Sequence, residues 1–189
     1  MSEPSTESAP ARRDFVATLE ALRESGDRGA LATLRRGLAD VNGDFTIYRI
    51  IGRAMPNDLS EWEESCYRLV ACLYAAHQDN DDSADSLGAS AHLLWSRLGD
   101  GGNSLDIRFT ALLNAEAEDL PVRLRHLFSQ LAAQDVPVNY RTLLNDLRYW
   151  TSERRTTQRR WARDYWAQEQ EDPSDTPSVP TAEQNNVQA

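Results

Sequence analysis

The chain has 189 residues, 40% of them hydrophobic and five of them Trp, so it is long enough to bury one sizeable core. Its formal net charge of −10 argues against a general nucleic-acid-binding protein. No apolar run approaches the roughly 20 residues of a membrane span. The first ten residues lack the basic start and the apolar stretch of a secretory signal. We therefore expect a cytoplasmic protein.

Apolar residues recur every three or four positions between two polar tails. The tails, residues 1–10 and 170–189, are rich in Pro, Ser, Thr and acids, and they cannot bury enough apolar surface to offset the entropy cost of ordering. We predict that both are disordered and that an all-helical domain spans residues 11–169. No segment alternates with period two for long. The period predicts an all-α fold, a compact bundle of about eight to nine helices that could divide into two packed sub-bundles.

The expected helices follow one another in chain order, each marked by its own apolar stripe. The stripes are Phe15/Leu19/Leu22, Leu31/Leu34/Leu38, Phe45 to Ala54, Trp62/Cys66/Leu69/Leu73, Leu87/Ala91/Leu94/Leu98, Leu105/Phe109/Leu112, Leu120/Leu124/Leu127/Leu131, Tyr140/Leu143/Leu147 and Thr157/Trp161/Tyr165. Asn103 and Asp119 are the expected N-caps of the sixth and seventh of these helices, and the stripe of the eighth follows Asn139. The last helix is expected to start near Ser152 and to turn its stripe inward.

Residue patterns typical of catalytic or metal sites are missing from the sequence. Cys66 and Cys72 are six residues apart in one helical pattern, which predicts two buried thiols rather than a disulfide or a metal knuckle. The acidic loop from Asp79 to Asp85 has Ala84 and Ser90 where a calcium-binding EF-hand loop needs Gly and Glu. The histidines do not form the HExxH pair of metallopeptidases. We predict that the protein is not an enzyme and needs no cofactor or metal.

Charge is unevenly distributed along the chain. Residues 57–120 contain three arginines and thirteen acids, whereas residues 121–166 contain nine arginines and four acids. A cationic segment therefore lies inside an acidic protein, and fields act locally at a screening length of ~8–10 Å. All twenty basic residues are Arg, a bias that a GC-rich genome largely explains. The planar guanidinium nevertheless suits phosphate and stacks on bases.

The last helix presents the clearest arginine pattern. Arg155, Arg159 and Arg163 are spaced i, i+4, i+8 on a stripe beside Trp166, and Asp164 is the only nearby acid, placed toward Arg160. A polyanion would relieve repulsion along the stripe, and an exposed Trp can stack a base for roughly 1–3 kcal/mol. The alternative is a solvated face, or one that pairs with the acidic middle segment. Five further arginines are expected at the rim of the bundle beside apolar stripes: Arg35, Arg36, Arg108, Arg123 and Arg125.

The order and spacing of six motifs resemble the CasB family, the small subunit of the type I-E CRISPR surveillance complex Cascade. The resemblance covers roughly residues 13–167. The motifs are ALATLRRGL (30–38), LGASAHLLW (87–95), RFTALL (108–113), LRHLFSQL (124–131), VPVNYRTLLNDLRYW (136–150) and QRRWARDYW (158–166).

The resemblance implies an all-helical, non-enzymatic subunit present as two copies packed head to tail. Its implied partners are the guide-coating backbone subunits, the large subunit, CRISPR RNA and target DNA. It implies an arginine surface that steadies the guide–target duplex and the displaced strand of the R-loop, with Arg35, Arg36 and Arg108 as the leading candidates and Arg125 and the terminal-helix arginines after them. The alternative is a helical protein–protein scaffold without nucleic-acid contact. The acidic tails depart from a basic subunit, and we interpret them as solubilising or as a guard against indiscriminate DNA binding before assembly.

Overall fold

The computed structural model describes residues 14–39, 45–99 and 102–166, and this part of the chain is all-α, as predicted. It contains nine α-helices and two short 3-10 helices, with one isolated β-bridge between Asn80 and Val138. None of the described helices is both long and apolar enough for a membrane span. Both predicted tails lie outside the described residues. The elements are α1 Phe15–Glu24, α2 Arg28–Gly37, η1 Phe45–Ile47, α3 Tyr48–Ile51, α4 Glu61–Ala76, α5 Leu87–Leu98, α6 Gly102–Leu113, η3 Ala117–Asp119, α7 Leu120–Ala133, α8 Tyr140–Arg148 and α9 Thr156–Trp166.

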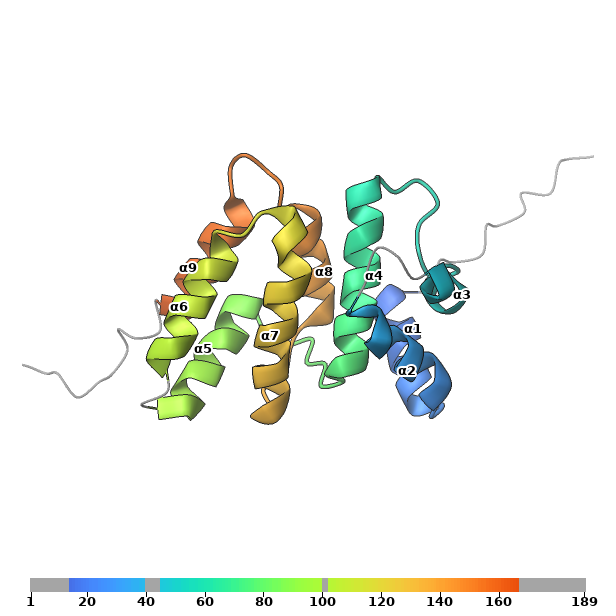
Figure 1. Cartoon of the computed structure of the whole chain (residues 1–189), viewed down its shortest axis with the longest axis horizontal. Helices are drawn as coiled ribbons and strands as arrows, with labels where there is room; N and C mark the ends of the chain where they lie inside the picture. Colours follow the sequence, from blue (N-terminus) through green and yellow to red (C-terminus); the bar gives the residue numbers. More distant parts are fainter. Residues whose placement is uncertain (1–13, 40–44, 100–101, 167–189) are drawn as a thin grey trace, which may run out of the picture.

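Helix α4 lies in the middle of the molecule, with α2 on one side and α7 and α8 on the other (Figure 1). Every residue from Cys66 to Ala75 is buried, which is the signature of a helix surrounded by other elements. Its start is fixed by a capping box, in which the Ser60 hydroxyl accepts from the backbone N–H of Glu63 and the Glu63 carboxylate accepts from the backbone N–H of Ser60. The buried apolar side chains form one continuous core that reaches from Phe15 in α1 to Tyr165 in α9.

Helices α5, α6, α7 and α9 lie on the side of α4 that faces away from α1 and α2 (Figure 1). The closest packing among these four helices is the crossing of α5 and α9. Gly88 in α5 lies directly against the backbone of Trp161 in α9. Polar contacts flank this crossing: the Ser86 hydroxyl donates to the Asp164 carboxylate, and His92 Nδ1 lies 2.8 Å from the carbonyl of Tyr165. Helix α9 is therefore fixed along its length, and its remaining surface is available to partners.

Three expected helix starts or extents differ from the structure. The segment 45–54 forms only a 3-10 turn and the four-residue α3, because the chain turns at Gly52. Asn103 lies inside α6 instead of capping it. The last helix begins at Thr156, four residues after Ser152, because intervening turns connect α8 to α9. Asp119 occupies its predicted N-cap position but makes no side-chain cap bond, whereas Asn139 caps α8 by accepting from the backbone N–H of Thr142.

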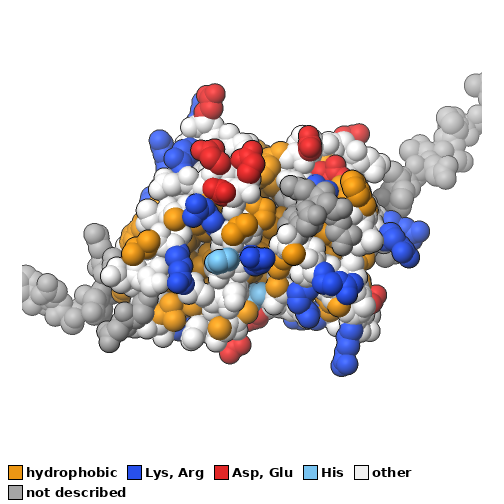
Figure 2. Space-filling model, in the orientation of Figure 1, with side chains coloured by type: hydrophobic (Ala, Val, Ile, Leu, Met, Phe, Trp, Pro, Cys, Tyr) orange, Lys and Arg blue, Asp and Glu red, His pale blue; other side chains and the backbone are white. Residues whose placement is uncertain are grey.

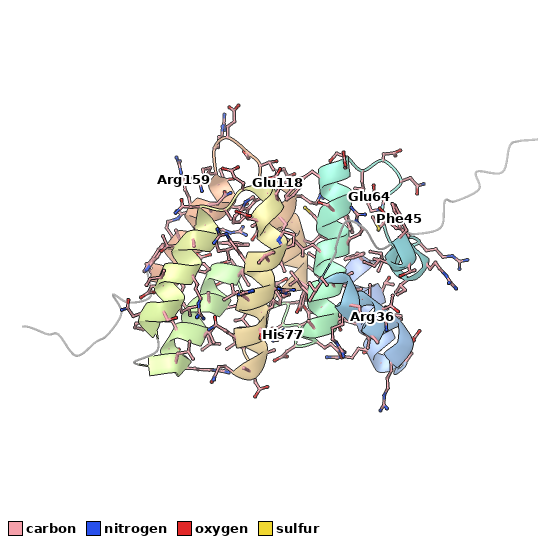
Figure 3. All side chains as sticks on the ribbon, in the orientation of Figure 1. Arg36, Phe45, Glu64, His77, Glu118 and Arg159 are labelled. Atoms are coloured by element: carbon pink, nitrogen blue, oxygen red, sulfur yellow. The ribbon has the colours of Figure 1, made fainter. Side chains whose placement is uncertain are left out.

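His77 is expected to make the stability of the core depend on pH. Its ring is buried near the end of α4, with Nδ1 3.1 Å from the hydroxyl of Tyr140 (Figure 3). Burial lowers the pKa of His77 below 6.5, so below this pH the unfolded chain binds a proton that the folded chain resists.

We expect the free energy of unfolding to fall as the pH falls from 7 to 5, by at most about 1.4 kcal/mol per pH unit from this group. Urea unfolding at each pH measures the slope. His77→Gln should flatten it, because the Gln side chain carries no titratable proton. A slope that survives His77→Gln would show that another group is responsible.

Candidate nucleic-acid interface

Three arginines in the C-terminal half form close intramolecular ion pairs. Arg141 pairs with Asp14 and Asp82, and Arg148 pairs with Glu63. Arg160 pairs with the buried Asp146. None of the three belongs to the predicted nucleic-acid set, and each joins elements that are distant in sequence or separated by a turn. These three ion pairs therefore connect elements within the fold.

The eight arginines that were predicted to contact nucleic acid differ from these three in their ion pairing. Only Arg123 has a carboxylate of the described residues within 4.0 Å, and its 3.7 Å contact with Asp119 is solvent-exposed at both ends. Such an exposed pair contributes at most about 1 kcal/mol. The other seven make no ion pair with a carboxylate in residues 14–39, 45–99 or 102–166, and all seven are exposed: Arg35, Arg36, Arg108, Arg125, Arg155, Arg159 and Arg163.

Two of these seven arginines also hold helix ends. Arg35 Nε donates to the carbonyl of Ala75 at 3.0 Å, near the C-terminal end of α4. Arg155 donates to the carbonyl of Leu113, the last residue of α6. Carbonyls at a helix C-terminus have no intrahelical partner and favour a nearby cation. Arg35 and Arg155 are thus partly structural.

The structure corrects the predicted stripe on the last helix. Arg155 precedes α9 and has a left-handed backbone, with φ of 48°. The helical stripe therefore consists of Arg159 and Arg163 only. The predicted inward positions Thr157, Trp161 and Tyr165 are confirmed as buried.

Asp164 is not the only acid near Arg160, contrary to the expectation from the helix spacing. Arg160 instead contacts Asp146 in α8, because the turns between α8 and α9 place that carboxylate under the last helix. Asp164 accepts from Ser86 in the segment before α5. Trp166 is 38% exposed and packs against Phe109 and Tyr165, with ring centroids 6.2 and 5.1 Å apart. Part of its ring remains accessible for stacking.

Helices α6 and α7 bring two predicted arginines to one groove. Arg108 and Arg123 line a depression of about 400 Å³ between these helices, together with the exposed His126. Arg125 is exposed on the same helix as Arg123. The sequence pattern alone assigned no site role to His126. Its position three residues after Arg123, one turn along α7, is the signal that could have placed it there.

The predicted arginines do not all lie together. Arg36 on α2 and Arg159 at the start of α9 lie toward opposite ends of the molecule (Figure 3). On the face shown in Figure 2, basic side chains are spread over α6, α7 and α2, and acidic side chains gather along one edge. Glu118 and Glu64 lie at that edge. Most of the acidic side chains on this face therefore lie toward one edge.

The acidic loop and the two cysteines, which were candidates for a metal or disulfide site, have structural roles. The described part of the chain contains no group of three or more His, Cys, Asp or Glu side chains arranged to hold a metal ion. In the acidic loop, the amide of Asn139 donates to the carbonyls of Asp82 and Ala84, which ties the loop to the start of α8. Cys66 and Cys72 are both buried and form no disulfide, and burial raises the pKa of Cys66 to about 12.

Comparison with known families decides the relationship. Residues 30–166 match the family model described as CRISPR-associated protein Cse2. The chain belongs to the Cse2 family. It is 33% identical over 145 residues to the CRISPR-associated protein Cse2 of Thermus thermophilus, an alignment that covers 72% of this chain and 78% of that protein. The resemblance inferred from the six motifs is confirmed at the level of the family.

Solved structures share the same fold. The crystal structure of M. ruber CasB superposes with a TM-score of 0.68 at 29% identity, covering 83% of this chain and 94% of that one. A Cse2-family protein from Thermus thermophilus gives 0.65 at 31% identity, covering 81% and 96%. A chain of a CRISPR RNA-guided surveillance complex gives 0.61 at 22% identity, covering 80% and 92%, and this similarity is one of fold. The Cse2 family match ends at residue 166, before the acidic C-terminal segment.

Proposed function

We propose that this Cse2-family protein is a non-catalytic, cytoplasmic subunit of a type I-E RNA-guided CRISPR surveillance complex. In this role it holds nucleic-acid backbone through arginines. The observation that supports the proposal is the division of the arginines among the described residues. Seven of the eight predicted arginines have no carboxylate of these residues within 4.0 Å, whereas Arg141, Arg148 and Arg160 are paired within the fold. An unpaired exposed guanidinium can bind phosphate without first breaking an intramolecular contact.

Five arginines combine exposure with freedom from both ion pairing and backbone capping in the described part of the chain. They are Arg36, Arg108, Arg125, Arg159 and Arg163. They would contact the phosphates of the guide–target duplex or of the displaced strand, without reading bases. Because R-loop formation is a near-balanced exchange of duplexes, a modest electrostatic contact is enough to shift it. The guide-coating subunits, the large subunit and a second copy of this chain would complete the binding surface.

The test compares two variants with the same change in net charge. Arg108→Ala/Arg125→Ala removes charge from α6 and α7, and Arg49→Ala/Arg53→Ala removes two exposed arginines at α3 and just after it. In the reconstituted complex we expect the first variant to shorten the R-loop lifetime about tenfold, the effect of losing about 1.4 kcal/mol. The second should stay within about twofold.

Salt dependence separates the proposal from the scaffold alternative. Five single-strand phosphate contacts give a slope of log K against log salt of about −3.5, and Arg108→Ala/Arg125→Ala should reduce its magnitude by about 1.4. Equal losses from both variants would indicate a general charge effect. A flat slope, with R-loop lifetimes unchanged in both variants, would favour the protein–protein scaffold.

A further inference from the structure

The groove between α6 and α7 combines exposed apolar side chains with a basic rim. Ile107 is 68% exposed and Val122 is 55% exposed, and both line the groove. Among the described residues that line it, Arg108, Arg123 and His126 are basic, and Asp119 is the one with a carboxylate. Large exposed apolar side chains that share a concave surface indicate a binding site. The rim indicates an anionic occupant.

The chain itself contains a segment of matching chemistry. Residues 167–189 contain five acids and no basic residue, and they follow the part of the chain that matches the family. The acids are Glu169, Glu171, Asp172, Asp175 and Glu183. The same segment contains Ala167, Val179 and Val187, which offer apolar contacts to the groove.

The described chain ends close to the groove. Trp166, its last residue, packs against Phe109, which lines the groove from α6. The 23 residues that follow can span up to ~75 Å when extended, so the path around α6 is well within reach. A segment tethered this near to its site acts at an effective concentration on the order of millimolar.

We propose that residues 167–189 occupy the groove between α6 and α7 in the free subunit, with their carboxylates against Arg108 and Arg123. The segment then shields part of the arginine surface from nucleic acid until the complex assembles. This regulation rests on the proposed function, but the docking itself does not. The two are therefore measured separately.

The docking test uses the full chain with a nitroxide attached through Ser178→Cys. Cys66 and Cys72 are buried, so the label reacts at the new thiol. Paramagnetic broadening should weaken the NMR methyl signals of Ile107 and Val122. The methyl signals of Ile50 in α3, at the opposite end of the molecule, should not change (Figure 1). The broadening should disappear at 1 M salt, where the screening length is ~3 Å. Unbroadened Ile107 and Val122 signals at low salt would overturn the proposal.

The competition test measures single-stranded DNA affinity by fluorescence anisotropy at low salt. One variant neutralises the five tail acids as Gln or Asn. A matched control neutralises five exposed acids elsewhere: Glu24, Asp58, Glu61, Asp85 and Glu153. If the tail occupies the groove for about four-fifths of the time, the tail variant should bind about fivefold more tightly than the control. Equal affinities would overturn the competition.

The two measurements distinguish the two proposals. Broadening of Ile107 and Val122, with an R-loop lifetime unchanged by Arg108→Ala/Arg125→Ala in the reconstituted complex, would support the docking and contradict the proposed function. DNA binding without broadening would support the proposed function and overturn the docking.

Discussion

Gly88→Ala is expected to lower the free energy of unfolding by about 3 kcal/mol, the upper end of the usual range for overpacking a core. A Cβ at this position would lie 2.3 Å from the carbonyl oxygen and 2.7 Å from the Cα of Trp161. These are backbone atoms of α9, so no side-chain rotation relieves the clash. The two helices must separate, and the packing around the fully buried Trp161 must loosen.

Thermal unfolding followed by circular dichroism measures this effect. At roughly 2–4 °C per kcal/mol for a chain of this size, Gly88→Ala should lower the Tm by about 6–12 °C. Gly29→Ala is the matched control, because a Cβ at this exposed position in α2 meets only Asp27 Oδ1 at an ordinary 3.5 Å. It should raise stability by about 0.5 kcal/mol through the better helix propensity of Ala. Similar Tm values for the two variants would show that α5 and α9 are not closely packed in solution.

The Gly88 contact also matters for the proposed interface. Arg159 and Arg163 are presented by α9, whose position depends on the crossing with α5. If Gly88→Ala moves α9, Arg159 and Arg163 lose their positions. The R-loop lifetime in the assembled complex should then fall. A complex that keeps its full R-loop lifetime with this variant would argue that α9 is not part of the nucleic-acid surface.

The helical stripes were predictable from the sequence because local spacing alone determines which side chains share a helix face. Leu120, Leu124, Leu127 and Leu131 recur at helical spacing, and all four are buried in α7. Their burial needs no knowledge of the partner helix. The same holds for the buried positions of α9.

Contacts made by the turns were not predictable from spacing. Arg160 pairs with Asp146, fourteen residues earlier, rather than with Asp164 on its own helix, because the connection between α8 and α9 reverses the chain. Arg155 caps α6 from a left-handed position, which few non-glycine residues adopt. Both outcomes depend on where a turn directs the next helix, and residue types give little information about that direction.

The candidate site was predictable only in part for the same reason. The sequence indicated that Arg108 and Arg123 lie beside apolar stripes. Their meeting at one groove depends on how α6 and α7 pack after the short connection through η3. The exposure of Ile107 and Val122 depends on the same packing, since both residues would be buried if another helix covered the groove.

Asp146→Ala is expected to lower the free energy of unfolding by about 3 kcal/mol, because it removes a buried acceptor from two donors. The Asp146 carboxylate accepts from Trp161 Nε1 at 2.7 Å and from Arg160. Trp161 is fully buried, so its N–H would lose this acceptor with no water to replace it, whereas Arg160 is partly exposed and can recover water. Asp146→Asn keeps an oxygen for Trp161 and should cost only about 1 kcal/mol.

The pH dependence of this pair gives an independent check. Burial raises the pKa of Asp146 above 3.8, despite the opposing effects of Trp161 and Arg160. The folded protein therefore holds this proton more tightly than the unfolded chain does. The stability that the group contributes is present below pH 3.8 and is lost as the pH rises through the folded-state pKa. Urea unfolding should thus show a wild-type advantage over Asp146→Asn that shrinks with rising pH. An advantage that grows with pH would mean that the folded-state pKa of Asp146 lies below 3.8.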